Sequence, residues 1–360
     1  MADISKIVLP GGGTYDLKDA GARSAIPAAY ASNPAMDGTA SAGSSGNYAR
    51  GDHVHPTDVS RAPVYGLGKN LLDNWYFLDP VNQRGASSYT ANGYCIDRWY
   101  LKWAQSLEMT STGIKFTAQS NSVTQIVQEV GTGKVDEFQG KDVVFSVLVS
   151  SITGTGRISI AQGTSISNNE TTLKATDITG AGVYSISWRV NATAGYRLNW
   201  ILQASAGAVM TLAAAKLEIG KEQTLAHQEN GVWVLNEIPD YGEELRKCQR
   251  YLLVLSPLTD NYGFIGFASG NPNAGGATVI LNTPVTMRKG TPSIQRSGDW
   301  RLFDRTGGAT FSSVTAISKP RLTQNAVAFV AEITGAVAGR LYEMASYDDA
   351  SAQLIISVEL

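Results

Sequence analysis

Two histidines one residue apart stand in the segment Tyr48-Ala-Arg-Gly-Asp-His-Val-His-Pro56, and the whole chain has only three. Residues i and i+2 of an extended backbone point to the same side, so His53 and His55 aim one way. Pro56 favours extended geometry at His55. Two imidazoles are too few for a tight transition-metal site, but three parallel chains around an axis would offer six, an octahedral set for a divalent metal such as Fe²⁺. The alternative is a solvated turn in which both histidines cap backbone groups.

Residue types for nucleophilic or acid–base catalysis are sparse outside that segment. His227 is the one remaining histidine, and we expect it to make an inter-domain contact. The chain has no GxSxG, CxxC or HExxH motif and no phosphate-binding loop, and Gly11-Gly-Gly13 is typical of a turn. Counting acidic residues does not exclude a glycosidase pair, but no β-helical repeat is present. We expect a protein that is not an enzyme.

Side chains that suit sugar recognition gather near turns in the C-terminal part of the chain. Sugars stack on aromatic faces and bond to amides and carboxylates. Trp300 follows a Gly-Asp turn, which indicates a loop position, although a tryptophan is more often a core residue. The candidate ligand-binding residues are Tyr262, Asn271, Asn273, Trp300, Arg301 and Asp304. We expect Trp75, Trp99 and Trp103 to serve in core or inter-domain packing instead.

Composition favours a β-rich protein of two or three domains. The chain has 360 residues, of which 17% are charged, and 37 are glycine. A net charge of −2, with lysines and arginines scattered, gives no reason to expect nucleic acid binding. No stretch approaches the ~20 apolar residues of a membrane span, and the N-terminus lacks a signal-peptide pattern. We expect no membrane insertion, and Cys95 and Cys248 as buried free thiols.

Turn and linker signals divide the chain into five parts. Residues 1–24 form a small β element with a turn at Pro10-Gly-Gly-Gly13, and residues 25–65 are linker-like. Alternation of period two across residues 66–236 predicts a β-sandwich. Residues 251–360 return to strand-like runs, and together these patterns predict an all-β fold.

Residues 237–250 are the one clear helical stretch. Pro239 lies near its start, acidic residues come early and basic residues late, which complements the helix dipole. Leu245, Cys248 and Leu252 are spaced to form one apolar stripe. Such a stripe packs either against copies of itself around a threefold axis or on a neighbouring sheet.

Several motifs resemble those of bacteriophage tail fibres. The segment YARGDHVHPTDVSRAP is similar to a collar-like segment in which histidine pairs line a threefold axis and can hold iron. LPGGGTYDLKDAGAR resembles the start of fibre proteins whose N-terminal end attaches to the baseplate, which makes tail-attachment candidates of Tyr15, Asp16, Lys18 and Asp19. NLLDNWYF, NQRG, IDRWYL and AKLEIGKEQT resemble a carbohydrate-binding-module-like jelly roll. EELRKCQRYLLVL and TPVTMRKGTPSI resemble the C-terminal head domain of such fibres, which usually meets the host surface.

The resemblance implies a homotrimeric fibre in five segments. These are an attachment segment (1–24), a thin intertwined stalk (25–65), a jelly roll (66–236), a helical neck (237–250) and a β-sandwich head (251–360). Its partners would be two further copies, phage baseplate or tail proteins and a bacterial cell-surface glycan. Its place would be the virion tail, after synthesis in the host cytoplasm. The alternatives are a carbohydrate-active enzyme or monomeric lectin of two β-sandwiches, and a purely structural spacer or baseplate protein.

Native mass spectrometry tests the stalk. We expect three chains plus one iron-sized mass for the intact protein, and loss of that mass in a His53→Ala/His55→Ala variant, because six imidazoles bind metal only in the assembled state. Three chains without metal would reduce the histidines to turn residues. A single chain would contradict the trimer and favour the lectin or enzyme.

Overall fold

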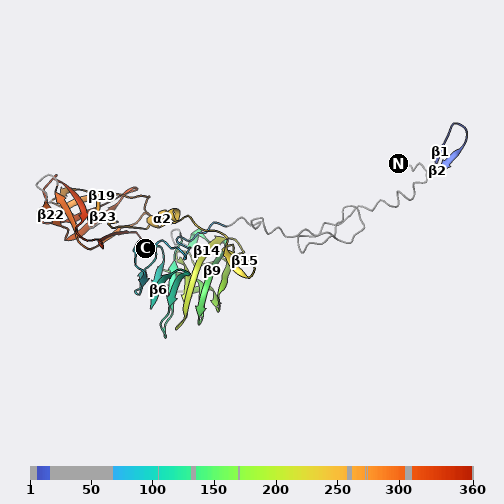
Figure 1. Cartoon of the computed structure of the whole chain (residues 1–360), viewed down its shortest axis with the longest axis horizontal. Helices are drawn as coiled ribbons and strands as arrows, with labels where there is room; N and C mark the ends of the chain where they lie inside the picture. The colour runs from blue at the N-terminus through green and yellow to red at the C-terminus, as the bar shows by residue number, and fades with distance from the viewer. Residues whose placement is uncertain are drawn as a thin grey trace. The chain divides into compact units, whose positions relative to one another are not determined.

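The computed structural model describes residues 6–16, 68–103, 105–130, 135–168, 171–257, 262–271, 273, 275–304 and 310–358. The chain divides into two compact units, Met1–Leu67 and Gly68–Leu360. In the second unit, Figure 1 draws one set of strands that includes β6, β9 and β14 and another that includes β19, β22 and β23.

The described part of the first unit is an antiparallel hairpin of β1 (Lys6–Val8) and β2 (Thr14–Asp16). Its turn closes through the Leu9 amide, which donates to the Gly13 carbonyl over 3.0 Å, and Gly12 adopts a φ of 83° there. This agrees with the small β element predicted from the sequence. The predicted stalk, with His53 and His55, lies outside the described residues, and the trimer stays a prediction.

A β-sandwich fills the first part of the second unit, as the alternation predicted. Its two six-stranded antiparallel sheets follow a jelly-roll-like order. The first sheet runs β11 (Thr171–Ile178), β10 (Gly156–Gly163), β13 (Arg197–Ala204), β8 (Thr124–Gln128), β5 (Tyr100–Lys102) and β4 (Gly93–Tyr94). The second runs β12 (Gly182–Arg189), β9 (Asp142–Thr153), β14 (Val209–Ile219), β7 (Gly113–Thr117), β6 (Ser106–Thr110) and β3 (Ser88–Tyr89).

Alternate residues of each sheet build the core between them. Leu101, Ile126 and Leu202 of the first sheet are buried in one cluster with Phe145 and Leu217 of the second. Their strand neighbours point away from this core, because successive side chains of a strand face opposite sides. A short 3₁₀ helix, η1 (Val135–Glu137), and a two-stranded hairpin, β15 (Ala226–Glu229) with β16 (Val232–Leu235), complete this part.

The one described α-helix, α2 (Tyr241–Gln249), is shorter than the predicted neck. Asp240 caps it by accepting the Glu243 amide over 2.8 Å, and the preceding Pro239 cannot donate within a helix. The predicted stripe is wrong at Leu252, which lies on the strand β17 (Leu252–Leu255) beyond the helix end. Cys248 is fully buried within its own chain.

The C-terminal part contains two antiparallel sheets around a second core. A three-stranded sheet holds β17, β26 (Gln353–Ser357) and β20 (Ser293–Ser297). A seven-stranded sheet runs β22 (Thr310–Ser313), β21 (Trp300–Asp304), β25 (Leu341–Ser346), β18 (Phe264–Asn271), β19 (Gly276–Asn282), β24 (Ala326–Glu332) and β23 (Ala316–Leu322). Every strand pair in the described part of the chain is antiparallel, and with the β-sandwich this confirms the all-β prediction.

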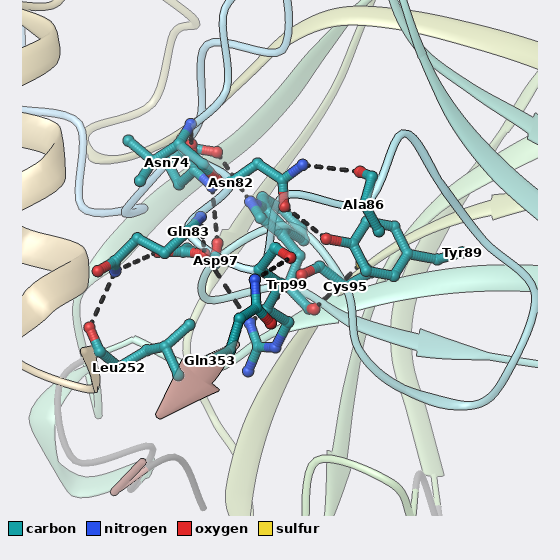
Figure 2. A network of polar contacts seen from close by, with 12 residues as sticks. Asn74, Asn82, Gln83, Ala86, Tyr89, Cys95, Asp97, Trp99, Leu252 and Gln353 are labelled. Atoms are coloured by element: carbon teal, nitrogen blue, oxygen red, sulfur yellow. Dashed lines mark hydrogen bonds and ion pairs between the residues drawn. The ribbon is translucent and has the colours of Figure 1, made fainter. Parts of the chain in front are cut away.

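A buried polar network joins the two β-rich parts (Figure 2). Asn74 is its centre: its amide nitrogen donates to the carbonyls of Val81 and Asp97, each over 2.8 Å, and its backbone amide donates to Glu244 of α2. The Gln83 amide nitrogen donates to the Asp97 carboxylate over 2.6 Å and to the carbonyl of Leu252 over 2.9 Å. The opening segment of the sandwich is therefore bonded to the helix and to the first strand of the C-terminal part.

Arg98 adds a charged contact to this junction. Its guanidinium carbon lies 3.4 Å from the centroid of the Tyr251 ring, and its Nε donates to Asp73 over 3.0 Å. A further bond reaches the carbonyl of Glu129 over 3.0 Å. The Asp73 carboxylate raises the pKa of Arg98 against the opposing effect of burial, so the side chain stays charged.

Replacement of this arginine tests the junction. We expect Arg98→Ala to lower the free energy of unfolding by about 3 kcal/mol, because it leaves a partly buried carboxylate without its cation. The matched control is Arg189→Ala, whose pair with Asp142 spans 3.3 Å at an exposed surface and should matter by no more than about 0.5 kcal/mol. Urea titrations followed by tryptophan fluorescence give both values. Equal losses in the two variants would show that the junction is not a stabilising contact.

Candidate ligand-binding site

An exposed aromatic cluster with an arginine forms in the C-terminal part. The Tyr347 ring is its centre, with Tyr262 at 5.4 Å and Phe311 at 4.7 Å between centroids, both edge-on. The Arg301 guanidinium carbon lies 3.6 Å from the centroid of the Tyr347 ring. Tyr262 is 53% exposed and Phe311 is 44% exposed, so solvent reaches the aromatic surface. Below, the aromatic cluster means these four residues.

Three separate turns bring the cluster together. Tyr262 precedes β18, and the neighbouring Gly263 exchanges two hydrogen bonds with Ser346, of 2.7 and 3.0 Å. Tyr347 follows β25, and its amide donates to the carbonyl of Asp299 over 2.9 Å. The ends of β18, β21 and β25 are therefore tied by backbone bonds, because these strands are neighbours in the seven-stranded sheet.

Hydrogen bonds fix Arg301 and the carboxylates beside the aromatic cluster. Asp299 accepts from Arg301 at Nε over 3.0 Å and at Nη2 over 2.7 Å, and this bonding raises the pKa of the guanidinium. Asp349 accepts from the Ser351 hydroxyl over 2.7 Å and from the Asp299 amide over 3.0 Å, and these bonds lower the pKa of its carboxyl. The Arg301 guanidinium and the Asp349 carboxylate are therefore both ionised at neutral pH.

The phenol of Tyr262 stays a neutral hydroxyl. Loss of hydration and the nearby Asp348 carboxylate both raise its pKa above the ordinary value. The cluster thus offers a stacking surface, a phenolic hydroxyl and a fixed guanidinium side by side. This combination suits an uncharged ligand with apolar faces and hydroxyl groups.

Of the predicted ligand-binding residues, Tyr262 and Arg301 meet in this cluster. Two others, Trp300 and Asp304, are buried and do not belong to it. The loop position predicted for Trp300 is wrong: the residue opens β21, is fully buried, and donates from its indole nitrogen to the Ser297 carbonyl over 2.9 Å. Asp304 is also buried, and its carboxylate pairs with Arg340 over 2.7 Å. Neither side chain presents a surface to a ligand.

Asn271 and Asn273 are exposed but distant from the cluster along the sheet. Asn271 ends β18, seven residues beyond its first residue Phe264, which is about 23 Å in an extended strand. Of the tail-attachment candidates, Tyr15 and Asp16 lie on β2 opposite Ile7 and Lys6. Lys18 and Asp19 lie outside the described residues.

Two other expectations from the sequence need correction. Among the described residues, the ring nitrogens of His227 bond to Glu229 of its own hairpin and to Asn236 directly after it, over 2.8 and 2.5 Å, and not across a domain boundary. Trp103 is not a core residue, because it is 45% exposed.

The sequence reasoning missed Tyr347, Phe311 and Asp299. The sequence indicates turn positions for two of them. Tyr347 directly precedes an Asp-Asp pair, and Asp299 belongs to the Gly-Asp turn before Trp300. Strict alternation from Trp300 would also have placed Trp300 inward and Arg301 outward.

Within the described residues, no group of three or more histidine, cysteine, aspartate or glutamate side chains is arranged to hold a metal ion. None of the helices described there is long and apolar enough to cross a membrane. Cys95 and Cys248 are buried free thiols, as predicted.

Comparison with known proteins assigns the chain to no family. No protein-family model and no curated protein matches the chain. A matching solved structure is the N-terminal CBM22-1–CBM22-2 tandem domain of Xyn10C from Paenibacillus barcinonensis, at 10% identity. The match covers 82% of this chain and 99% of that one, with a TM-score of 0.27. At this TM-score we draw neither fold nor ligand from the likeness.

Stability measurements separate the core tryptophan from the surface tyrosine. Trp300→Ala should lower the free energy of unfolding by about 4 kcal/mol, because it empties a closed part of the core. Tyr262→Ala should cost about 1 kcal/mol or less, the worth of an exposed edge-on ring contact. Urea unfolding of both variants measures the difference, and a large loss in the tyrosine variant would make the cluster a packing element.

Proposed function

We propose that this chain is a receptor-binding fibre subunit of a phage or phage-tail-like particle, and that it attaches the particle to a bacterial cell-surface glycan. The observation that carries the glycan part is the aromatic cluster, with rings 4.7 and 5.4 Å from Tyr347 and a guanidinium fixed on it. The fibre part rests on the sequence motifs. The virion tail is then the site of action.

A sugar fits the chemistry of the aromatic cluster. The C–H faces of a pyranose ring stack on the exposed tyrosine and phenylalanine surface, and its hydroxyls accept from Arg301 and exchange bonds with the Tyr262 phenol. Asp299 already neutralises Arg301, which disfavours a strongly anionic ligand. A neutral glycan is the class that uses every group in the cluster.

The state of the carboxylates at this site favours adhesion over catalysis within this proposal. A glycosidase needs one carboxyl that keeps its proton near neutral pH, which usually requires a raised pKa. At this site Asp349 has a lowered pKa and Asp299 is bonded to a guanidinium. Neither is suited to protonate a leaving group.

Three copies would strengthen a weak site. Linked sites gain avidity without any new contact, which suits a receptor that repeats over a cell wall. The homotrimer, the baseplate attachment through the N-terminal segment and the metal at His53 and His55 are predictions of the sequence within this proposal. A monomeric lectin would use the same cluster, and the oligomeric state separates the two.

Binding of the full-length protein to an array of bacterial surface glycans tests the proposal. We expect at least one glycan to bind, and Tyr262→Ala to weaken that binding by about tenfold, the effect of losing roughly 1.4 kcal/mol of stacking. Arg301→Ala should weaken it as well.

The matched control is Tyr241→Ala, which removes a similarly exposed tyrosine on α2. Its binding should equal that of the unchanged protein. A bound glycan that is insensitive to Tyr262 and Arg301 would move the receptor site away from the cluster, and no binding at all would favour a purely structural protein.

A further inference from the structure

The outer face of the seven-stranded sheet carries large apolar side chains that are open to solvent. Four of them are between 47% and 61% exposed: Phe264, Phe267, Ile280 and Leu341. The rings of Phe264 and Phe267 lie edge-on, with 5.2 Å between their centroids. Phe303 on β21 adds a half-buried ring. Below, the apolar face means these five residues.

Strand register places the aromatic members in a row away from the core. Phe303 of β21 lies opposite Glu343 of β25, and Glu343 lies opposite Phe267 of β18. Leu302 and Ala268, their neighbours in the strands, belong to the buried core cluster. Because successive side chains of a strand alternate, the row points to the other side of the sheet. The strand β18 is the fourth of seven, so Phe267 stands in the middle of the sheet.

The corresponding face of the first sandwich sheet is polar. There Gln125 lies opposite Gln203, and Gln203 lies opposite Arg157. Arg157 in turn lies opposite Asp177. An antiparallel sheet with one face in water normally shows this polar pattern. The apolar face departs from it within the same chain, and such a face is typical of a surface that a partner covers.

The size of the seven-stranded sheet suits a stable interface. Strands roughly 4.8 Å apart, with about five residues at 3.4 Å each, give it a flat outline of roughly 500 Å². Side chains that stand on the sheet make its accessible area larger than this outline. The area therefore approaches the value of about 800 Å² that each partner buries in a standard interface.

The chemistry of the apolar face favours a copy of the same chain as the partner. Aromatic and aliphatic surface with little charge is the composition of homo-oligomer interfaces rather than of transient contacts. Two identical sheets of this kind need no opposite charges, and they pack about 10 Å apart with their strands nearly aligned. So apolar a surface also needs its partner as soon as the chain folds, because it otherwise aggregates. A further copy of the chain is always present at that moment.

We propose that copies of this chain assemble through the apolar face, with Phe267 at the centre of the contact. The inference rests on the proposed homotrimer for the number of copies, but not for the surface. Three sheets around one axis bring their middle strands together, so each Phe267 lies beside its counterparts, and Ile280 and Phe303 flank it. The aromatic cluster lies at the margin of the sheet, since Phe311 belongs to the edge strand β22, and it stays open to a ligand.

Cross-linking of the full-length chain tests this surface. The probe is Ile280→Cys treated with a short bis-maleimide at low micromolar protein concentration, and the products are separated on a denaturing gel. We expect most chains to form covalent dimers, because the new thiols of neighbouring copies lie within reach of one another. The native thiols of Cys95 and Cys248 are buried and do not compete.

The matched control is Val232→Cys, because Val232 is 63% exposed and Ile280 is 61% exposed, each on a strand. It should give only background dimers, and it corrects for the high local concentration that a shared stalk creates. Adding Phe267→Glu to the Ile280→Cys chain should lower the cross-linked fraction at least about tenfold, because the contact would bury a carboxylate without a cation. Circular dichroism of that variant should be unchanged, since the ring lies outside the core of its own chain.

Three results would overturn the proposal: equal cross-linking of the two cysteine variants, cross-linking that survives Phe267→Glu, or a full chain with the mass of one copy. Glycan-array binding decides the proposed function separately. A chain that cross-links through Ile280→Cys but binds no glycan keeps this interface and loses the adhesive role. A single-copy chain that binds a glycan loses the interface and is a monomeric lectin.

Discussion

The buried polar junction around Asn74 is the constraint on which the second unit depends. Asn74 and Arg98 both adopt left-handed backbone conformations, with φ of 53° and 71°. Such conformations cost free energy and persist only where hydrogen bonds and packing impose them. Here the Asn74 side chain bonds to two carbonyls, and its backbone bonds to Glu244 of the helix. The strain is therefore offset by contacts that also join the sandwich to the C-terminal sheets.

Polar satisfaction also holds for buried carboxylates elsewhere in the second unit. Asp97, Glu218 and Asp304 are buried, and each carboxylate has a hydrogen-bond donor or a cation beside it. The carbonyl oxygen of Gln125 and the indole nitrogen of Trp200 break that rule, since neither has a hydrogen-bond partner among the described residues.

Local patterns were sufficient for the β-sandwich and for the C-terminal end of the helix. Period-two alternation across residues 66–236 predicted this sandwich, where β7, β9, β10, β12 and β13 each have one face on the core. The candidate site was predicted only in part. Residue type and nearby turns predicted Tyr262 and Arg301 correctly. They misplaced Trp300, because the Gly-Asp turn ends directly before it and the inward-facing strand β21 begins at the tryptophan itself.

The sequence by itself determined the all-β class, the helical stretch that contains α2 and the turn at Gly12, since each of these depends on neighbours in the chain. Tertiary structure alone decided that Tyr262, Arg301, Phe311 and Tyr347 meet, because strands β18, β21, β22 and β25 become neighbours only through pairing across up to about 80 residues. It also decided which polar groups lack partners. Gln125 looks ordinary in sequence, and the lack of a donor for its side-chain oxygen among the described residues arises only from the register that sets it between Lys102 and Gln203 on a largely covered sheet face.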